Sequence, residues 1–402
     1  METQAVYWAE PLTWEFEARI IQKTRLGNGQ FEVILERSYF YPTGGGQLHD
    51  TGILGQARVV DVFRDEDGMI VHRVEGDVSG PLVTARIDGS RRLGHMQHHS
   101  AQHIISRALE QRLGLETLSA KISADSPSTI DVPDVELSGS DIQQVEGLVN
   151  QLVFENRPIK TYFITADQLG TVPLRRPPKV SGQIRVVEVA EFDYSACGGT
   201  HCLTTGMIGL IKIVKTERKN KKLRLHFVAG QQALTFFQQD HEVVTDLCRQ
   251  LSTHPGEVAR VVSRQAEQLA AAQREISGLR AELLSFETQQ LSAQAEPHGT
   301  VRLAIKLYPN RVIGELRELA KQLQAQDNLV AVLAGYDGQK LTVVTSCAIG
   351  SAINARELLD HCLAEIGGRG SGDDRLAQGG GNASSEQVER LLTQARTFLT
   401  AK

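Results

Sequence analysis

The chain has 402 residues, with 43 Lys and Arg against 48 Asp and Glu, so its formal net charge is −5 with neutral His. A hydrophobic content of 41% supports several cores and excludes collagenous and wholly disordered chains. We find neither a secretion signal nor a stretch near the roughly 20 apolar residues of a membrane span, and we therefore expect a cytoplasmic protein without membrane contact. The mild acidity gives no overall reason to expect nucleic acid, so any such binding must be local.

The five cysteines, at positions 197, 202, 248, 347 and 362, are odd in number and lie in a chain without a secretion signal. This argues against a disulfide framework and leaves one or two of them for other chemistry.

Residues 1–88 contain stretches in which apolar and polar residues alternate, for example at 31–36 and 57–63. Gly and Asp residues separate these stretches. The pattern predicts short strands joined by tight turns, in a small barrel or a sandwich.

The pattern changes at Arg91, where helical spacing begins and continues to a stop at Gly114. A second helix is predicted with Ser140 as its N-cap, ending before Pro158. Strands are predicted at 159–165, 184–190 and 207–214. We therefore predict a mixed α+β domain over residues 89–230.

Residues 231–292 are rich in Gln, Glu, Ala and Leu and carry a heptad pattern. Its predicted a positions are Val262, Leu269, Ile276 and Leu283, and its d positions are Val258, Gln265, Ala272, Leu279 and Phe286. This predicts a coiled coil or a long helical hairpin arm, which either self-associates or folds back within one chain.

Residues 293–402 are predicted to form a small α/β domain. A strand at 301–307 precedes a helix, a hairpin that turns at Asp337 and Gly338, another helix and a glycine-rich segment at 367–381. The fold class is thus α+β multidomain: an N-terminal small β-barrel, an α+β domain, a helical coiled-coil arm and a C-terminal small α/β domain.

A metal site is predicted from two pairs of residues with the same spacing. His99 and His103 are four apart on the first predicted helix, and Cys197 and His201 are four apart in Cys-Gly-Gly-Thr-His. Imidazole and thiolate together suit zinc better than magnesium or calcium. A pair of solvated or core histidines is the alternative, and rival ligands are His95, His98 and Cys202, of which His98 points away from His99 in a helix.

Ser100 stands where a metalloprotease helix requires Glu, which makes a zincin mechanism a poor fit. Asp193 is interpreted as a surface acid, with a carboxylate that orients a metal ligand as the alternative. A second unusual segment, residues 43–47, contains three glycines. Their backbone amides could contact a carbonyl or a phosphate group. The alternative is that the segment is a simple hairpin turn.

Seven basic side chains against one acid lie between Lys212 and Arg224, which predicts a local phosphate-contacting surface, with an exposed basic turn as the alternative. Further basic residues of the same predicted domain are Arg91, Arg92, Arg175, Arg176 and Lys179.

Five motifs occur together in one order. They are Phe-Tyr-Pro-Thr-Gly-Gly-Gly-Gln at 40–47, His-Ser-Ala-Gln-His at 99–103, Cys-Gly-Gly-Thr-His at 197–201, the basic run at 221–230 and the glycine-rich segment at 367–381. They resemble the alanyl-tRNA editing domain, and the whole chain resembles the long form of the AlaX trans-editing proteins. The last segment is similar to the C-terminal domain of alanyl-tRNA synthetase.

The resemblance implies hydrolysis of the ester in mischarged tRNA-Ala, with release of serine or glycine. It implies one Zn²⁺ per chain on His99, His103, Cys197 and His201. It also places the loop of Thr43, Gly44, Gly45, Gly46 and Gln47 beside the aminoacyl group, where we expect Gln47 and Thr43 to position substrate, Thr43 by binding the serine hydroxyl. Implied tRNA contacts are Arg218, Lys219, Lys221, Lys222, Arg224 and, in the last domain, Arg369.

The chain departs from this family pattern at two positions. Gln102 lies where synthetases often carry Thr, and Ser371 interrupts the terminal glycine run. No segment before the barrel has room for a class II aminoacylation core, so we expect a standalone hydrolase.

The residues leave alternatives for the zinc site and for the function. Four protein ligands would make a closed, structural zinc site, whereas a loosely bound His201 would leave a position for water. Other functions are a catalytically silent, zinc-containing tRNA-binding protein and, less favoured for want of Asp and His clusters, a nuclease or phosphoesterase. A homodimer is expected through the arm or the terminal domain.

Overall fold

The computed structural model describes residues 3–178 and 182–400, and the chain forms two compact units, residues 1–250 and 251–402. Lys179 lies outside the described residues. Among the described helices, none combines the length and apolar character that crossing a bilayer requires. The finer division into four domains at residues 88, 230 and 292 stays a prediction.

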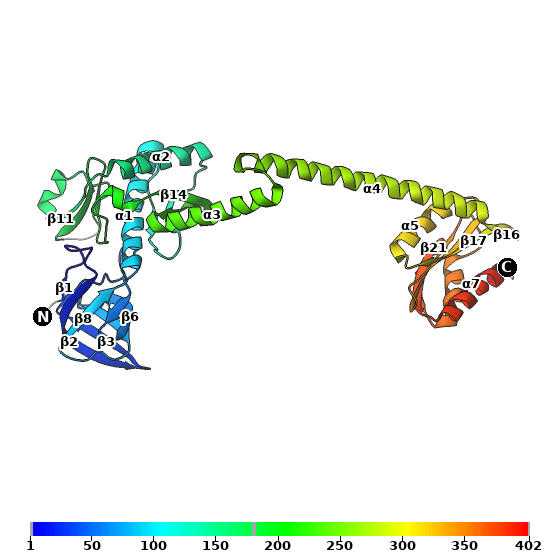
Figure 1. Ribbon diagram of the computed structural model, residues 1–402, viewed down its shortest axis with the longest axis horizontal. Helices are drawn as coiled ribbons and strands as arrows, with labels where there is room; N and C mark the ends of the chain where they lie inside the picture. The colour runs from blue at the N-terminus through cyan, green and yellow to red at the C-terminus, as the bar shows by residue number, and fades with distance from the viewer. Residues whose placement is uncertain (1–2, 179–181, 401–402) are drawn as a thin grey trace. The chain divides into compact units, whose positions relative to one another are not determined.

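The first unit begins with a closed six-stranded barrel, drawn in blue in Figure 1. In barrel order its strands are β2 (Glu15–Gly27), β3 (Gln30–Leu35), β7 (Ile70–Glu75), β6 (Ala57–Arg64), β5 (Gly52–Leu54) and β8 (Leu82–Ile87). A short parallel pair, β1 (Gln4–Ala5) and β4 (Arg37–Ser38), accompanies them. Alternate residues of β8 are buried, as period-2 patterning requires, and the barrel alternative is confirmed over the sandwich.

Helix α1 (Gly89–Leu113) leaves the barrel and runs into the layer of helices and sheets above it (Figure 1). The Asp88 carboxylate caps its start by accepting from the Arg91 backbone N–H, and Gly114 ends it in the left-handed region at φ 67°. The predicted stop is therefore confirmed, and the helix begins two residues earlier than Arg91.

Two sheets pack around α1 and α2 (Gly139–Glu155). The four-stranded sheet has the order β14 (Ile211–Lys219), β15 (Lys222–Ala229), β10 (Ser128–Pro133) and β9 (Ser119–Lys121). The three-stranded sheet has the order β11 (Ile159–Ile164), β12 (Ile184–Val189) and β13 (Asp193–Ala196). A 3₁₀ segment, η1 (Ala166–Thr171), follows β11.

Two predicted boundaries in this region are wrong. The N-cap of α2 is Ser138, not Ser140, because Ser138 and Asp141 form a reciprocal capping box. The strand predicted at 207–214 starts only at Ile211, since a 3₁₀ turn, η2 (Thr205–Ile208), and Gly209 at φ 70° precede it. A left-handed glycine interrupts an extended strand.

The helical segment consists of α3 (Gly230–Leu251), a 3₁₀ turn, η3 (Pro255–Glu257), and the 37-residue α4 (Val258–Gln294). The predicted helical character is confirmed. Along α4, the large apolar residues of the predicted seam are exposed, with exposed fractions from 49% at Val262 to 67% at Phe286.

The second unit contains a six-stranded sheet in the order β16 (Glu296–His298), β17 (Val301–Pro309), β18 (Leu329–Tyr336), β19 (Lys340–Cys347), β21 (Leu376–Asn382) and β20 (Arg369–Gly372). Its helices are α5 (Ile313–Gln324), α6 (Ala355–Leu363) and α7 (Ser385–Thr400), with a short η4 (Ala364–Ile366). Alternate residues of β18 face different cores: Val330 and Val332 pack with α6 and α7, whereas Ala331 and Leu333 pack with α5.

Candidate metal centre

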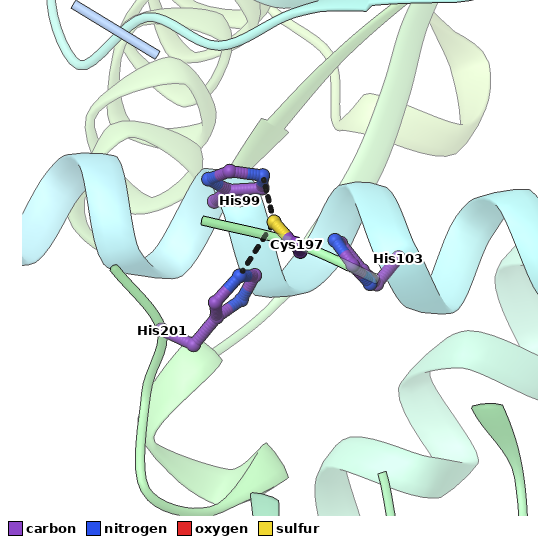
Figure 2. A group of neighbouring side chains, drawn as sticks. All are labelled: His99, His103, Cys197 and His201. Atoms are coloured by element: carbon purple, nitrogen blue, oxygen red, sulfur yellow. Dashed lines mark hydrogen bonds between the residues drawn. The ribbon is translucent and has the colours of Figure 1, made fainter. Parts of the chain in front are cut away.

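Four side chains from two distant parts of the first unit converge on one point (Figure 2). His99 and His103 project from one face of α1, Cys197 follows β13 directly, and His201 lies in the loop beyond it. Their ligand atoms all lie within 4.8 Å of one another. The Cys197 Sγ atom is 3.3 Å from Nε2 of His99 and 3.4 Å from Nε2 of His201. The structure thus brings together all four predicted ligands.

Gln47 fixes the orientation of His99 from the barrel side. It is fully buried, and its Oε1 atom accepts from His99 Nδ1 at 2.8 Å and from the Thr200 backbone N–H at 3.2 Å. Its Nε2 donates to the Thr200 hydroxyl at 2.9 Å. Both ends of the amide are therefore committed to the protein, and the His99 Nε2 lone pair is directed to the centre.

The other two histidines are held through Nδ1 as well. The Asp193 carboxylate accepts from His103 at 3.3 Å and from Arg175 at 2.9 Å, while the Ser100 hydroxyl lies 3.2 Å from His201. Asp193 is 1% exposed, so its interpretation as a surface acid is wrong. Each imidazole consequently presents Nε2 to the centre, with its other nitrogen engaged, as is usual for metal-ligating histidine.

The rival ligands lie outside this cluster. His98 points to the other side of α1, where its ring nitrogens contact the Gly94 carbonyl and Gln232. Burial raises the pKa of the Cys202 thiol to about 12, which keeps it protonated, and burial lowers the pKa of His95 to about 3. The prediction that disfavoured His98 is confirmed.

Gly199 permits the close approach of the cysteine loop to α1. A Cβ atom at this position would lie 2.1 Å from Cε1 of His99, a separation that no side chain tolerates. The glycine is therefore a steric requirement of the site, as the Cys-Gly-Gly-Thr-His pattern indicated.

The electrostatics of the cluster favour a thiolate among neutral and protonated imidazoles. Burial alone would raise the pKa of Cys197, but the neighbouring His99 and His201 hold it well below its usual range. Burial would lower the pKa of His103, but hydrogen bonds to Asp193 and Cys197 raise it to about 9. For His201, burial and the charge of His99 lower the pKa to about 3.

This donor set fits zinc. Three imidazole nitrogens and one thiolate are borderline-soft ligands in the number that a tetrahedral zinc site requires. The side chains that would hold the ion are buried or half-buried, and the hydrogen bonds to Gln47, Asp193 and Ser100 fix the three rings. We therefore describe the cluster as a candidate zinc centre of His99, His103, Cys197 and His201.

A cavity of about 500 Å³ opens beside the centre, within the size range of small-ligand sites. His99, His103 and Cys197 line one end of it, and Gly45 contributes from the glycine loop. Thr43 is turned elsewhere: its hydroxyl accepts from the His49 backbone N–H at 3.1 Å. The loop therefore reaches the cavity through Gly45, while Gln47 lies behind the metal ligands.

The other two glycines of the loop, Gly44 and Gly46, make backbone contacts within the protein. Gly44 forms a bridge with Gln47 through reciprocal backbone hydrogen bonds, and the Gly46 carbonyl accepts from Ile122. Gly46 has φ 86°, and a Cβ there would lie 2.8 Å from the Ala120 carbonyl oxygen. The hairpin-turn alternative thus describes part of this segment.

The predicted basic surface lies on the hairpin of β14 and β15, and it is partly neutralised. Arg224 makes two hydrogen bonds to Asp131, at 2.7 and 2.9 Å, and Arg218 pairs with Asp134 at 3.2 Å. Lys219 and Lys221 are exposed near the turn, and Lys222 is half-buried. The hairpin tip therefore carries the accessible positive charge.

Comparison with known proteins adds an independent observation. Residues 184–225 match the family described as threonyl and alanyl tRNA synthetase second additional domain. Alanine-tRNA ligase of Methanopyrus kandleri is 31% identical over 417 residues, covering 98% of this chain and 44% of that protein. Alanine-tRNA ligase of Pyrococcus furiosus is 30% identical over 394 residues, covering 94% and 42%. The chain is related to alanyl-tRNA synthetases.

This relationship confirms the resemblance inferred from the motifs. The chain spans less than half the length of these curated relatives. The family match, residues 184–225, includes both candidate ligands of the cysteine loop and the basic hairpin as far as Leu225 in β15. A solved structure, the C-Ala domain from Aquifex aeolicus alanyl-tRNA synthetase, is 26% identical and covers 27% of this chain and 98% of that one, with a TM-score of 0.25.

Proposed function

We propose that this chain is a zinc-dependent deacylase that hydrolyses mischarged tRNA-Ala in trans, releasing serine or glycine. The observation that carries the proposal is the cavity beside the four-residue centre, in a chain related to alanyl-tRNA synthetases. An aminoacyl ester is already activated, so the protein needs mainly to orient the ester and a water molecule and to favour the charge that develops on the carbonyl oxygen.

Zinc, when bound by these four ligands, supplies a fixed positive charge and joins α1 to the cysteine loop. Because every imidazole is held through Nδ1, including His201 by Ser100, we favour the closed set over the open one. Gln47 is assigned a positioning role, since its amide holds His99 and Thr200 rather than substrate. The glycine loop meets the aminoacyl group through Gly45.

The sequence predicts that Thr43 binds the serine hydroxyl. To make that contact, its own hydroxyl would have to leave the His49 backbone N–H. We therefore place the discrimination of serine from alanine in the cavity that Gly45 and His103 line, and assign Thr43 to fixing the turn.

The test is deacylation of Ser-tRNA-Ala and Ala-tRNA-Ala by the purified chain, with zinc content measured in parallel. Because removal of an outer-shell partner of a metal ligand alone costs about 10- to 100-fold in affinity or activity, Cys197→Ala and His103→Ala should each lose about 100-fold or more. Cys248→Ala, on α3 and outside the cluster, is the matched control. Undiminished hydrolysis in both ligand variants would overturn the metal-site proposal.

One observation favours a second candidate, a catalytically silent tRNA-binding protein. A closed set of four protein ligands is the pattern of structural zinc sites. This candidate predicts that the zinc-loaded wild type binds tRNA-Ala and leaves Ser-tRNA-Ala intact.

The proposed tRNA contacts are Arg218, Lys219, Lys221 and Lys222 on the hairpin, together with Arg369 on β20. Arg224 is assigned to the hairpin's own stability because Asp131 engages its guanidinium on two sides. A substitution that removes a phosphate contact should reduce the dependence of tRNA binding on salt. The slope of log affinity against log salt concentration therefore distinguishes residues that contact phosphate from Arg224, which is assigned to the stability of the hairpin.

We also propose that the chain forms a homodimer through α4. Its predicted seam carries Leu269, Ile276, Leu279, Leu283 and Phe286, each more than half exposed. Side chains of this kind at heptad spacing are stabilised by burial against a partner helix. Sedimentation velocity of the full chain tests the proposal.

A further inference from the structure

The tip of the glycine loop is a two-residue hairpin turn. Gly44 and Gln47 exchange backbone hydrogen bonds at 3.0 and 2.9 Å, and the two residues between them, Gly45 and Gly46, have φ values of 56° and 86°. Positive φ at both central positions is typical of a type I′ turn, which glycine adopts without steric cost. The turn is therefore held by the backbone of its two end residues, and the N–H groups at its tip are left for other partners.

The Tyr41 hydroxyl fixes the orientation of the peptide group between Gly44 and Gly45. Tyr41 is buried, and its hydroxyl donates to the Gly44 carbonyl oxygen at 3.0 Å. The Gln47 N–H donates to the same oxygen, so both of its lone pairs are engaged. Because a trans peptide group is planar, the Gly45 N–H points in the direction opposite to the Gly44 carbonyl.

Tyr41 is itself held in place through its backbone and its ring. Its backbone N–H donates to the Asp50 carboxylate at 2.6 Å, and Asp50 pairs with Arg92 of α1. Its ring meets the ring of Tyr7 at a centroid distance of 5.3 Å in an edge arrangement. The direction of the Gly45 N–H is therefore set by the packing of the barrel against α1, before any ligand binds.

The Gly45 N–H is an unused donor at the cavity. Gly45 lines the cavity together with His99 and Cys197, whereas Tyr41 lies outside its lining. Within the part of the chain that the structure describes, no acceptor pairs with this N–H. A Cβ built on Gly45 would meet no atom within 4 Å, so a substrate oxygen has room to approach the backbone there.

A backbone N–H can only donate, which restricts what it can meet on an aminoacyl ester. The protonated amino group of the ester is also a donor and is excluded, which leaves the oxygen atoms. Of these, the carbonyl oxygen becomes an anion in the tetrahedral intermediate, because attack of water on the carbonyl carbon moves the π electron pair onto it. The pair returns as the ester C–O bond breaks, the water loses a proton and the ribose oxygen gains one.

We infer that the Gly45 N–H donates to the oxyanion of the tetrahedral intermediate, and that Tyr41 is the residue that positions this donor. The inference rests on the proposed function and deepens it, because it names a group that favours the charge on the carbonyl oxygen. A donor that is already oriented needs no reorganisation as the charge develops. Its hydrogen bond is therefore stronger in the transition state than in the ground state.

The first experiment removes the N–H without changing a side chain. Replacing Gly45 by glycolate turns its amide into an ester in the full zinc-loaded chain, and steady-state deacylation of Ser-tRNA-Ala gives kcat and KM. Because loss of one oxyanion donor costs about 100- to 1000-fold in kcat, kcat should fall by that factor with little change in KM. Gly29, at φ 74° in the turn between β2 and β3 and outside the cavity lining, is the matched control for the same replacement and should keep both values.

Tyr41→Phe tests the positioning role. It removes the hydroxyl and keeps the ring, so kcat should fall while KM stays unchanged. The same substitution should cost nothing further in the chain that already carries the ester at position 45, because the hydroxyl acts through the N–H. Tyr39→Phe is the control, since the Tyr39 hydroxyl pairs with Glu10 at 3.2 Å. A loss in Tyr41→Phe that adds in full to the loss from the ester would overturn the positioning role.

A second measurement separates this inference from the proposed function. It compares the affinities for two non-hydrolysable analogues of seryl-adenosine, one with a tetrahedral, anionic phosphonate in place of the ester carbonyl and one with a planar amide in place of the ester. The ester at position 45 should weaken binding of the phosphonate far more than binding of the amide. Unchanged kcat and unchanged phosphonate affinity would overturn the inference. A wild type that binds the phosphonate through Gly45 but leaves Ser-tRNA-Ala intact would instead refute the proposed function and retain the donor.

Discussion

Helices α1 and α4 are both long, and they distribute polar and apolar residues in opposite ways. Along α1, the buried side chains of Arg92, His99 and His103 have hydrogen-bond or ion-pair partners, whereas the ring nitrogens of buried His95 have no hydrogen-bond partner. Along α4, the buried residues are confined to Val261 and the C-terminal end, while large apolar side chains are exposed.

The two helices therefore differ in what stabilises their side chains. A partner within the fold stabilises a buried polar group, since leaving the group unpaired costs about 1–3 kcal/mol, and more for a charged group. An exposed apolar row has no such internal requirement and gains free energy only when a partner covers it. The contrast therefore predicts that substitutions in and around α1 act on stability and metal binding, and that those along the α4 seam act on association.

The largest effect is expected at the buried ion pair between Arg92 and Asp50, where both side chains are fully buried. Arg92→Met leaves an uncompensated carboxylate and should lower the free energy of unfolding by about 3–5 kcal/mol. Urea denaturation followed by tryptophan fluorescence measures it. Arg274→Met, at an exposed position of α4, should stay within about 0.5 kcal/mol, and equal losses in both variants would contradict the contrast.

A second effect concerns the stability of the fold at acidic pH. Burial lowers the pKa of His72 to about 4 from 6.5, so the folded barrel favours the neutral ring. Its contribution is complete above pH 6.5 and is lost as the pH falls toward 4, a change of roughly 3 kcal/mol.

Denaturation at pH 7 and pH 4.5 measures this contribution, with His72→Gln as the variant. The wild type should lose more stability between the two values than the variant does. The control is His241→Gln on the exposed part of α3, which should keep the wild-type dependence. A parallel dependence in wild type and His72→Gln would refute the assignment.

A third effect concerns the Asp193 carboxylate, which accepts a hydrogen bond from the candidate metal ligand His103. Asp193→Asn removes the charge that holds the ring, and zinc affinity should fall about 10- to 100-fold. Competition with a chromophoric chelator measures it. Asp131→Asn removes a carboxylate from another arginine pair of the same unit, away from the centre, and should leave zinc affinity unchanged.

The smallest effect on stability is expected on α4. Leu279→Lys combined with Leu283→Lys should abolish self-association in sedimentation velocity while changing the free energy of unfolding by only about 0.5 kcal/mol. Ala271→Lys, at an exposed position off the predicted seam, should preserve association. A double variant that sediments like the wild type would refute the arm as the interface.

The sequence predicted the features that depend on local periodicity. The spacing of four placed His99 and His103 on one helix face, and Gly114 ended that helix as expected. Alternation and turn residues indicated a small barrel or a sandwich, and the structure contains the barrel. The relationship with alanyl-tRNA synthetases followed from several short motifs in one order.

Other features depend on which distant residues meet, and periodicity carries no such information. Gln47 contacts Thr200 across 153 positions, so its role behind His99 follows only from the packing of the barrel against α1. Asp193 belongs to a four-residue strand, too short for a recognisable pattern, and its burial was therefore missed. Ser138 displaced Ser140 as a cap because Asp141 supplies the reciprocal hydrogen bond.

The separation of the ligand pairs along the chain has a consequence for biosynthesis. His99 and Cys197 lie 98 residues apart. At about 5–20 residues per second, the ribosome needs roughly 5–20 s to add the second pair after the first. During that interval the two histidines of α1 have no thiolate beside them, so a metal ion held by all four side chains can bind only after the cysteine loop has been synthesised.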